Sequence, residues 1–272
     1  MAQTAQVLGI VGSPNKQGRT QRIVGAALEG ARQHGASTEM VFLSDYPLSA
    51  CKDCRPWTCR TTHQCAYDTD GHFATVSGKF LSADAVVFGT PVYYGIASEA
   101  ATIFMQRMHR TQANLANGMP ALGIAVAGGT GGGLISGLRP VYHFLQIMGA
   151  RALRPLPATR FNWEQSLVEA EALGRALADA ARERRPFQGL ERLAWYDDLE
   201  YLGMTRVEER VLLTGLLMTA IDQYDSPDAA NARRSFAQAL KLLDDEKRSE
   251  ALAMVDEAYA SGIKAYEAWI GA

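Results

Sequence analysis

"QVLGIVGSPNKQGRT" (residues 6–20) contains the pattern that decides the fold. Its first half is an apolar, β-branched run typical of a buried strand, and a loop of small and polar residues then leads directly into a helical segment. The same order recurs several times further along the chain, which predicts a parallel sheet covered by helices on both faces. We expect the strands at residues 6–13, 37–43, 84–91, 121–128 and 150–158.

Helix-period segments lie between and after these strands, at residues 20–34, 71–81, 97–110, 134–148 and 163–184. Five parallel strands with these crossovers predict an α/β protein with a flavodoxin-like, doubly wound, five-stranded sheet. In this architecture ligands bind at the carboxyl ends of the first, third and fourth strands. Binding residues are therefore expected in the loops that follow those three strands.

The chain changes character near Pro186, because only helix-period segments follow, at residues 190–204, 206–224, 231–247 and 249–270. We expect two parts: a flavodoxin-like domain over residues 1–185, with a cysteine-rich loop at residues 45–70, and an α-helical extension over residues 186–272. The amphipathic stripes of the extension suit packing against the sheet domain or a second subunit. Ser226 or Asp228 is expected near a helix start.

The composition is that of an ordinary globular protein, with 47% hydrophobic residues, 21% charged residues and a net charge of −2. The basic excess of residues 1–186 is small and dispersed, which suits an anionic small ligand and argues against nucleic acid. The apolar stretch at residues 211–221 is much shorter than the roughly 20 residues that span a bilayer. Residues 1–15 lack the pattern of a secretion signal, so we expect a cytoplasmic protein with no membrane partner.

The loop after the first strand has features that are typical of an anion-binding site. Unpaired backbone N–H groups and the positive end of the helix dipole meet where such a loop enters a helix. Ser13 and Thr20 add hydroxyl donors, and Lys16 and Arg19 add positive charge. The loop is neither a Walker A motif nor a G-x-G-x-x-G turn, and alone it is equally typical of a polar loop without a ligand.

Two further loops fall where the sheet would place its ligand. "GTPVYYGIASEA" (residues 89–100) carries two adjacent tyrosines, and "AGGTGGG" (residues 127–133) contains five glycines. Glycine lets the backbone approach a flat ring closely, and Tyr93 or Tyr94 can supply an aromatic face. Taken alone, the two tyrosines could be a partly buried core pair, and the glycines could form a flexible loop. Three such loops at three expected strand ends together indicate a ligand site.

All four cysteines of the chain lie in "CKDCRPWTCRTTHQC" (residues 51–65), in the spacing Cys51-x2-Cys54-x4-Cys59-x5-Cys65. In a reducing compartment, such a cluster indicates a metal or redox site more often than structural disulfides. Four thiolates from one loop can bind a [4Fe–4S] cluster or a single zinc ion. Two disulfides remain a third interpretation.

Charged residues lie among these cysteines. Lys52, Arg55 and Arg60 would offset the negative charge of thiolate ligands, or they are simply the exposed surface of the loop. His63 could replace one ligand if zinc were bound, although a lone histidine in a loop is more often solvated. The remaining histidines show no spacing typical of metal ligands.

"GSPNKQGRT", "ADAVVFGTPVYYGIAS" and the glycine-rich turn resemble the flavodoxin-like NAD(P)H-dependent FMN reductases over residues 7–157, and the cysteine run resembles their iron–sulfur flavoprotein branch. Two departures stand out: Arg19 occupies a position where the family often has Asn, and four residues separate Cys54 from Cys59 where that branch usually has two. The resemblance implies FMN as cofactor, bound by Ser13, Asn15, Gly18, Arg19, Thr20, Pro91, Val92, Tyr93, Tyr94, Gly95, Gly128, Gly129, Thr130 and Gly131.

The resemblance favours a [4Fe–4S] cluster on Cys51, Cys54, Cys59 and Cys65, which exchanges single electrons with FMN in a flavin-dependent oxidoreductase. It also implies a homo-oligomer, a dimer or tetramer, in which one subunit's cluster lies near another's flavin, with a small-molecule or protein redox partner. One alternative is an NAD(P)H-dependent FMN or quinone reductase with structural zinc in the cysteine loop. The other is a non-catalytic redox sensor or binding protein.

Overall fold

The computed structural model describes residues 4–271, so the first three residues of the stretch that lacks a secretion signal lie outside the described residues. The chain forms two compact units. The first unit comprises the chain up to Gly128, Gly133–Ala158 and Glu164–Gly203, and the second comprises Gly129–Gly132, Thr159–Trp163 and the chain from Met204 onward.

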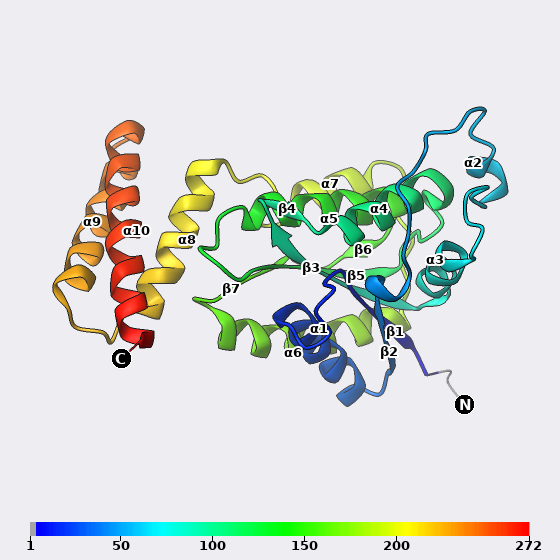
Figure 1. Ribbon diagram of the computed structural model, residues 1–272, viewed down its shortest axis with the longest axis horizontal. Coiled ribbons are helices and arrows are strands. Elements are labelled where there is room, and N and C mark those ends of the chain that lie inside the picture. The colour runs from blue at the N-terminus through cyan, green and yellow to red at the C-terminus, as the bar shows by residue number, and fades with distance from the viewer. Residues whose placement is uncertain (1–3, 272) are drawn as a thin grey trace. The chain divides into compact units, whose positions relative to one another are not determined.

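A parallel sheet forms the centre of the first unit (Figure 1). Its strand order is β2-β1-β3-β5-β6, and each of these neighbouring pairs is parallel. This order confirms the flavodoxin-like, doubly wound fold predicted from the sequence. The strands span Gln6–Val11 (β1), Ser37–Phe42 (β2), Ala85–Tyr93 (β3), Pro120–Ala127 (β5) and Arg151–Ala152 (β6).

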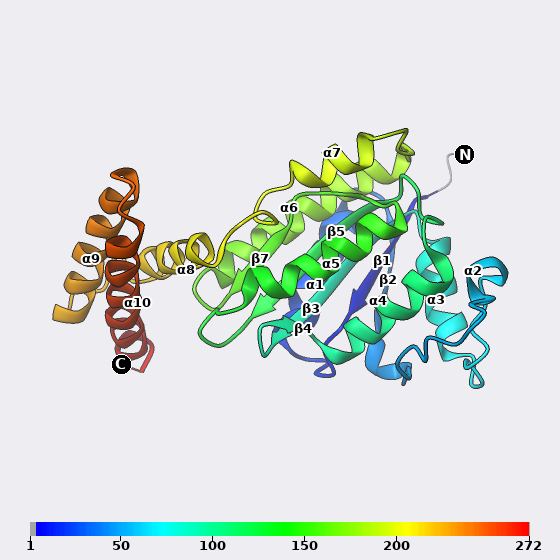
Figure 2. The same cartoon turned by 90° about the horizontal axis from the view of Figure 1, so that it is seen from above.

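Helices cover both faces of this sheet (Figures 1 and 2). On one face α1 and α6 pack closely, since a Cβ on Gly30 or Gly174 would collide with the backbone of the facing helix. On the other face, the rings of Phe80, Phe104 and Phe144 join α3, α4 and α5 around Phe88 of β3. The helices span Arg19–Gln33 (α1), His72–Ser82 (α3), Glu99–Gln112 (α4), Leu134–Met148 (α5), Trp163–Arg182 (α6) and Glu191–Asp197 (α7).

Three details of the first unit differ from the sequence-based expectation. The expected fifth strand is divided into β6 and β7 (Leu156–Thr159), because Pro155 has no N–H and the Leu153 carbonyl accepts from the Tyr142 hydroxyl at 3.0 Å. A short strand, β4 (Ile96–Ala97), pairs antiparallel with the end of β3. A 3₁₀ turn, η1 (Leu43–Asp45), and a short helix, α2 (Cys59–Thr62), lie in the segment after β2.

The second unit is built around three helices: α8 (Arg206–Ala220), α9 (Pro227–Asp244) and α10 (Arg248–Gly271). Phe161, Leu217, Ile221 and Tyr266 are among the residues of its apolar core. Ser226 begins α9 by accepting a hydrogen bond from the Ala229 N–H at 3.1 Å, which identifies which of the two expected residues starts that helix. None of the helices described in residues 4–271 has both the length and the apolar character required to cross a bilayer.

Candidate functional site

Buried hydroxyl groups join the loop after β1 to the end of β3. The Gly12 N–H donates to the Gly89 carbonyl at 2.8 Å, and the Ser98 hydroxyl donates to the Gly12 carbonyl at 2.6 Å. The Thr90 hydroxyl in turn accepts from the Ser98 N–H at 3.0 Å. Sequence reasoning missed Thr90 and Ser98, although a serine just before a helical run is a recognisable N-cap signal.

The loop after β1 keeps the features of an anion site. Ser13 and Thr20 are buried, and the Ser13 hydroxyl accepts from the Asn15 N–H at 3.2 Å. The Gly18 N–H donates to the Asn15 carbonyl at 3.1 Å, which closes the turn before α1. Gly18 is the N-cap of α1, and it offers no capping side chain, while the first turn contains no acidic residue. The helix N-terminus can therefore receive an anion.

The two basic residues of this loop are used differently. The Arg19 guanidinium donates to the Gly128 carbonyl at 3.3 Å and so joins the loop after β1 to the end of β5. Lys16 forms an ion pair with Asp45 at 2.5 Å and lies over the Phe42 ring. Its charge is therefore partly offset by Asp45.

The tip of the β3–β4 hairpin is a two-residue turn, Tyr94–Gly95, with φ of 52° and 75°. Positive φ at both positions is typical of the tight turns that match the twist of a hairpin. Tyr94 is fully exposed and Tyr93 is half exposed, so the two rings are not a core pair. Pro91 is buried, and Val92 packs so closely that a Cβ on Gly137 of α5 would lie 2.7 Å from it.

The glycine-rich loop after β5 makes close contacts at its far end and in its middle. Gly133, with a φ of 78°, lies so close to the hairpin that an added Cβ would stand 2.4 Å from the Gly95 Cα. Gly129, Thr130 and Gly131 belong to the second unit, where the Tyr259 hydroxyl donates to the Thr130 carbonyl. A Cβ on Gly129 would meet nothing within 4 Å.

The four cysteines come together around one small cavity. Cys51, Cys54, Cys59 and Cys65 all line it and are all free thiols, so the two-disulfide interpretation is wrong. Burial raises the pKa of the Cys59 thiol, and negative charge on the other three cysteines raises it further. Four thiolates around one cavity therefore need positive charge between or beside them, which the iron of a cluster or a zinc ion supplies.

No set of three or more Cys, His, Asp or Glu side chains within residues 4–271 is already arranged around a single metal position. The donor chemistry and the shared cavity fit a sulfur-ligated centre. His63 does not line this cavity. Its Nδ1 instead lies 2.7 Å from the Thr111 carbonyl, as in an N–H hydrogen bond.

The cysteine loop is docked on the last turns of α4. The Cys59 thiol lies 3.8 Å from the Arg110 carbonyl, and the Gln112 side-chain amide donates to the His63 carbonyl at 2.8 Å. Ser98 stands at the other end of the same helix, beside the Gly12 loop. Since α4 has 14 residues, the cysteine cavity and the loops after β1 and β3 lie at opposite ends of a helix about 21 Å long.

The sequence left two roles open for the basic residues among the cysteines, offsetting of thiolate charge or an exposed loop surface, and the structure divides them between the two. Lys52 lines the cavity, but Arg55 and Arg60 are exposed and stack on the Trp57 ring at 4.9 and 4.8 Å. Arg107 and Arg110 of α4 line the cavity instead, and sequence reasoning missed both. Their spacing of three residues places them on one helical face, but only the tertiary fold brings that face to the cysteines.

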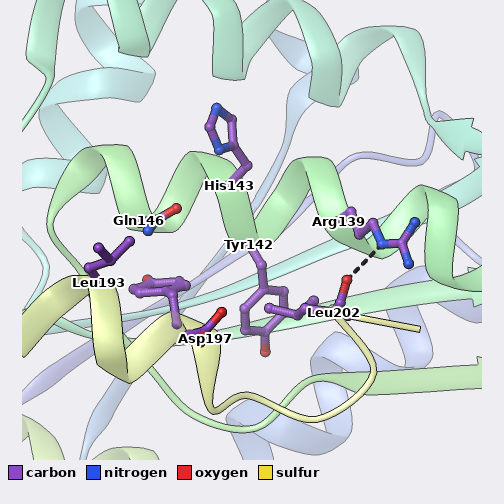
Figure 3. Close-up of a pocket in the computed structure, with 9 residues that line it drawn as sticks. Arg139, Tyr142, His143, Gln146, Leu193, Asp197 and Leu202 are labelled. Carbon is purple, nitrogen blue, oxygen red and sulfur yellow. Dashed lines mark hydrogen bonds between the residues drawn. The ribbon is translucent and has the colours of Figure 1, made fainter. Parts of the chain in front are cut away.

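A separate groove of about 330 Å³ lies between α5 and α7 (Figure 3). The Arg139 guanidinium closes one end by donating to the Leu202 carbonyl at 2.8 Å, and His143, Gln146 and Asp197 add polar groups. None of the binding residues expected from the sequence lines this groove.

Comparison with known proteins gives concordant results. Residues 5–166 match the model of a family described as NADPH-dependent FMN reductase. An iron-sulfur flavoprotein of Methanosarcina thermophila is 29% identical over 146 residues, which cover 53% of this chain and 74% of that protein. An iron-sulfur flavoprotein of Methanocaldococcus jannaschii is 30% identical over 145 residues, 52% of this chain and 71% of that protein.

A solved structure of a flavone reductase superposes with a TM-score of 0.52 at 18% identity, covering 68% of this chain and 66% of that one. At this identity the likeness concerns the fold, and it agrees with the strand order of the sheet.

Proposed function

Because this chain belongs to the NADPH-dependent FMN reductase family, in its iron–sulfur flavoprotein branch, and is a flavin-dependent oxidoreductase, we propose that it transfers single electrons between FMN and an iron–sulfur cluster. The observation that carries this proposal is the set of four free cysteine thiols around one cavity. FMN accepts either one or two electrons, so a one-electron centre in the same protein is a suitable exchange partner. Zinc at this position would be redox-inert.

We propose that FMN binds across the three loops that join at the carboxyl edge of the sheet. The uncapped N-terminus of α1 supports a phosphate position there, since backbone N–H groups and the helix dipole favour an anion. The proposed phosphate residues are Ser13, Asn15, Gly18, Arg19 and Thr20. The proposed ring residues are Pro91, Val92, Tyr93, Tyr94, Gly95, Gly128, Gly129, Thr130 and Gly131.

The placement of the two proposed sites supports an assembly of several subunits. They lie towards opposite ends of α4, a helix about 21 Å long. A homo-oligomer that brings one subunit's cysteine loop to another's β3–β4 hairpin would shorten the electron path. We propose such an assembly, in the cytoplasm, with residues 1–185 carrying both cofactors and the remaining residues serving assembly or a redox partner.

Replacement of one ligand tests the proposal. In anaerobically prepared protein, Cys59→Ala should abolish the broad visible absorption of the cluster and leave the flavin bands in place, because the cavity and the FMN loops are far apart. Gln64→Ala, an exposed change in the same loop, is the matched control. If Cys59→Ala leaves the spectrum and iron content equal to those of the control, the cysteines do not hold a cluster.

The zinc-containing reductase predicts a different result. It would contain zinc in place of iron and would rapidly oxidise NADH or NADPH in the presence of quinone or free flavin. Metal analysis combined with steady-state assays of both nucleotides separates the two functions. Protein that contains iron and sulfide and exchanges electrons between cluster and flavin supports the first proposal, whereas zinc-bound protein with rapid nucleotide oxidation supports the second.

A further inference from the structure

Arg107 is a buried cation beside the cysteine cavity. Its side chain is 4% exposed, and it lines the same cavity as the four cysteines. It comes from α4, the helix on which the cysteine loop docks. A charged group is seldom buried unless it meets a partner of opposite charge or a set of hydrogen-bond acceptors.

The groups around Arg107 leave one of its hydrogen-bond donors unused. Within the described part of the chain, its Nη2 is buried and has no hydrogen-bond partner. The Asp68 carboxylate lies 3.8 Å away, which is beyond hydrogen-bonding distance. Asp68 is also engaged elsewhere, since it accepts from the Phe73 and Ala74 N–H groups at 2.8 and 2.7 Å. The Phe73 ring, 4.6 Å from the guanidinium, contributes only a cation–π contact.

We propose that Arg107 donates a hydrogen bond from Nη2 to a sulfur atom of the iron–sulfur cluster and thereby raises its reduction potential. This inference rests on the proposed function. A reduced cluster with four thiolate ligands is anionic, so a buried guanidinium beside it stabilises the reduced state more than the oxidised state. The other nearby arginines are less suited to this role, because Arg55 and Arg60 stack on Trp57 and Arg110 pairs with Asp53 at 3.1 Å.

The test is a redox titration of the cluster in purified, cluster-loaded protein, with dithionite as reductant and the visible spectrum as readout. Arg107→Met should shift the equilibrium towards the oxidised cluster by about tenfold at a fixed potential, which is 59 mV for a one-electron couple. Arg55→Gln, which removes the same positive charge from an exposed position, should shift the equilibrium far less. Arg107→Lys, which keeps the charge, should shift it less than Arg107→Met.

Asp68→Asn provides a second variant in case Arg107→Met fails to load a cluster. Removing this carboxylate leaves Arg107 in place with less opposing charge, so the equilibrium should move towards the reduced cluster. A cluster-loaded Asp68→Asn with the potential of the wild type would overturn the inference, because a change in the charge that opposes Arg107 would then not reach the cluster. Wild-type protein without iron and sulfide would overturn the proposed function as well, whereas a loaded Arg107→Met with the potential of Arg55→Gln overturns this inference alone.

Discussion

The Ser98 hydroxyl joins two of the loops proposed to hold FMN. It donates to the Gly12 carbonyl at 2.6 Å and accepts from the Ala101 N–H at 3.3 Å, as the N-cap of α4. Ser98→Ala should lower the free energy of unfolding by about 1–3 kcal/mol, because it removes a cap and leaves a buried carbonyl without a partner.

The same change should weaken FMN binding, since Gly12 precedes the proposed phosphate residues. Thr102→Ala is the control, because the Thr102 hydroxyl lies on the same helix and donates to the Ala97 carbonyl at 3.4 Å. Chemical denaturation measures the stability, and quenching of flavin fluorescence measures FMN affinity. Equal FMN affinity in the two variants would show that the Ser98 bond does not shape the flavin site.

Tyr142 predicts how stability depends on alkaline pH. Its hydroxyl is fully buried, accepting from the Gly123 N–H at 3.1 Å and donating to the Leu153 carbonyl at 3.0 Å. Burial raises the pKa of Tyr142 far above its usual value of 10.0. As the pH rises through the usual value of 10.0, the unfolded chain releases the tyrosine proton and the folded chain retains it. The free energy of unfolding should therefore fall.

Tyr142→Phe removes this ionisation. It should cost about 1–3 kcal/mol at neutral pH through the lost hydrogen bonds. Between about pH 9 and about pH 11, the free energy of unfolding of Tyr142→Phe should fall less steeply than that of the wild type. Denaturant titrations across this range measure both quantities. Parallel curves for the two proteins would contradict the assigned burial.

Residue types and spacing were enough to propose the four cysteines as a metal or redox site and the three loops as a ligand site. Clustered thiols and glycines are easily recognised in a sequence. Arg107 could not be singled out in the same way. An arginine in an amphipathic helix is normally predicted to be exposed. Arg107 becomes part of the cavity only because the cysteine loop docks on α4. The sequence left two interpretations of Arg55 and Arg60 open, and the structure agrees with the exposed loop surface, since both side chains are exposed and stack on the Trp57 ring.

At the scale of elements, the meeting of the β3–β4 hairpin and the glycine-rich loop supplies a matched pair of substitutions. Gly133→Ala would place a Cβ 2.4 Å from the Gly95 Cα at a φ of 78°, so the two loops must move apart. Gly129→Ala meets nothing within 4 Å and needs no positive φ.

We therefore expect Gly133→Ala to bind FMN at least tenfold more weakly than the wild type, a loss of about 1.4 kcal/mol, and Gly129→Ala to bind nearly normally. Dissociation constants from fluorescence quenching test this difference. Similar affinities for both variants would mean that the contact between hairpin and loop does not support the ring.

The elements with strong periodicity were predictable, and α5 begins and ends at the expected residues. The short elements were not. Two-residue strands such as β4 and β6 follow from pairing with a neighbour rather than from a local pattern. The four-residue helix α2 likewise lies in a cysteine run without helical periodicity.

At the scale of the whole molecule, the second unit contains the middle of the glycine-rich loop. The Tyr259 hydroxyl of α10 donates to the Thr130 carbonyl within that unit. Tyr259→Phe should lower the free energy of unfolding of this unit by about 0.5–1.5 kcal/mol, because the Thr130 carbonyl loses its partner. Tyr266→Phe, which loses a longer bond to the Arg160 carbonyl in the same unit, should lower it less. Chemical denaturation measures both changes, and equal stability of Tyr259→Phe and the wild type would show that this bond does not hold the loop.

The change from alternating strands and helices to helices alone was visible in the sequence, because the strand signals stop after residue 158. The grouping of Gly129–Gly132 with α8, α9 and α10 was not, since it depends on contacts between segments more than 80 residues apart, such as Thr130 and Tyr259.

The central claim is that Cys51, Cys54, Cys59 and Cys65 hold a redox-active iron–sulfur centre in a flavin-dependent enzyme. Quantitation of iron, acid-labile sulfide and FMN in one anaerobic preparation of the full chain tests it most directly. We predict about four iron and about four sulfide for each FMN. Stoichiometric zinc, or bound flavin with neither iron nor sulfide, would contradict the claim.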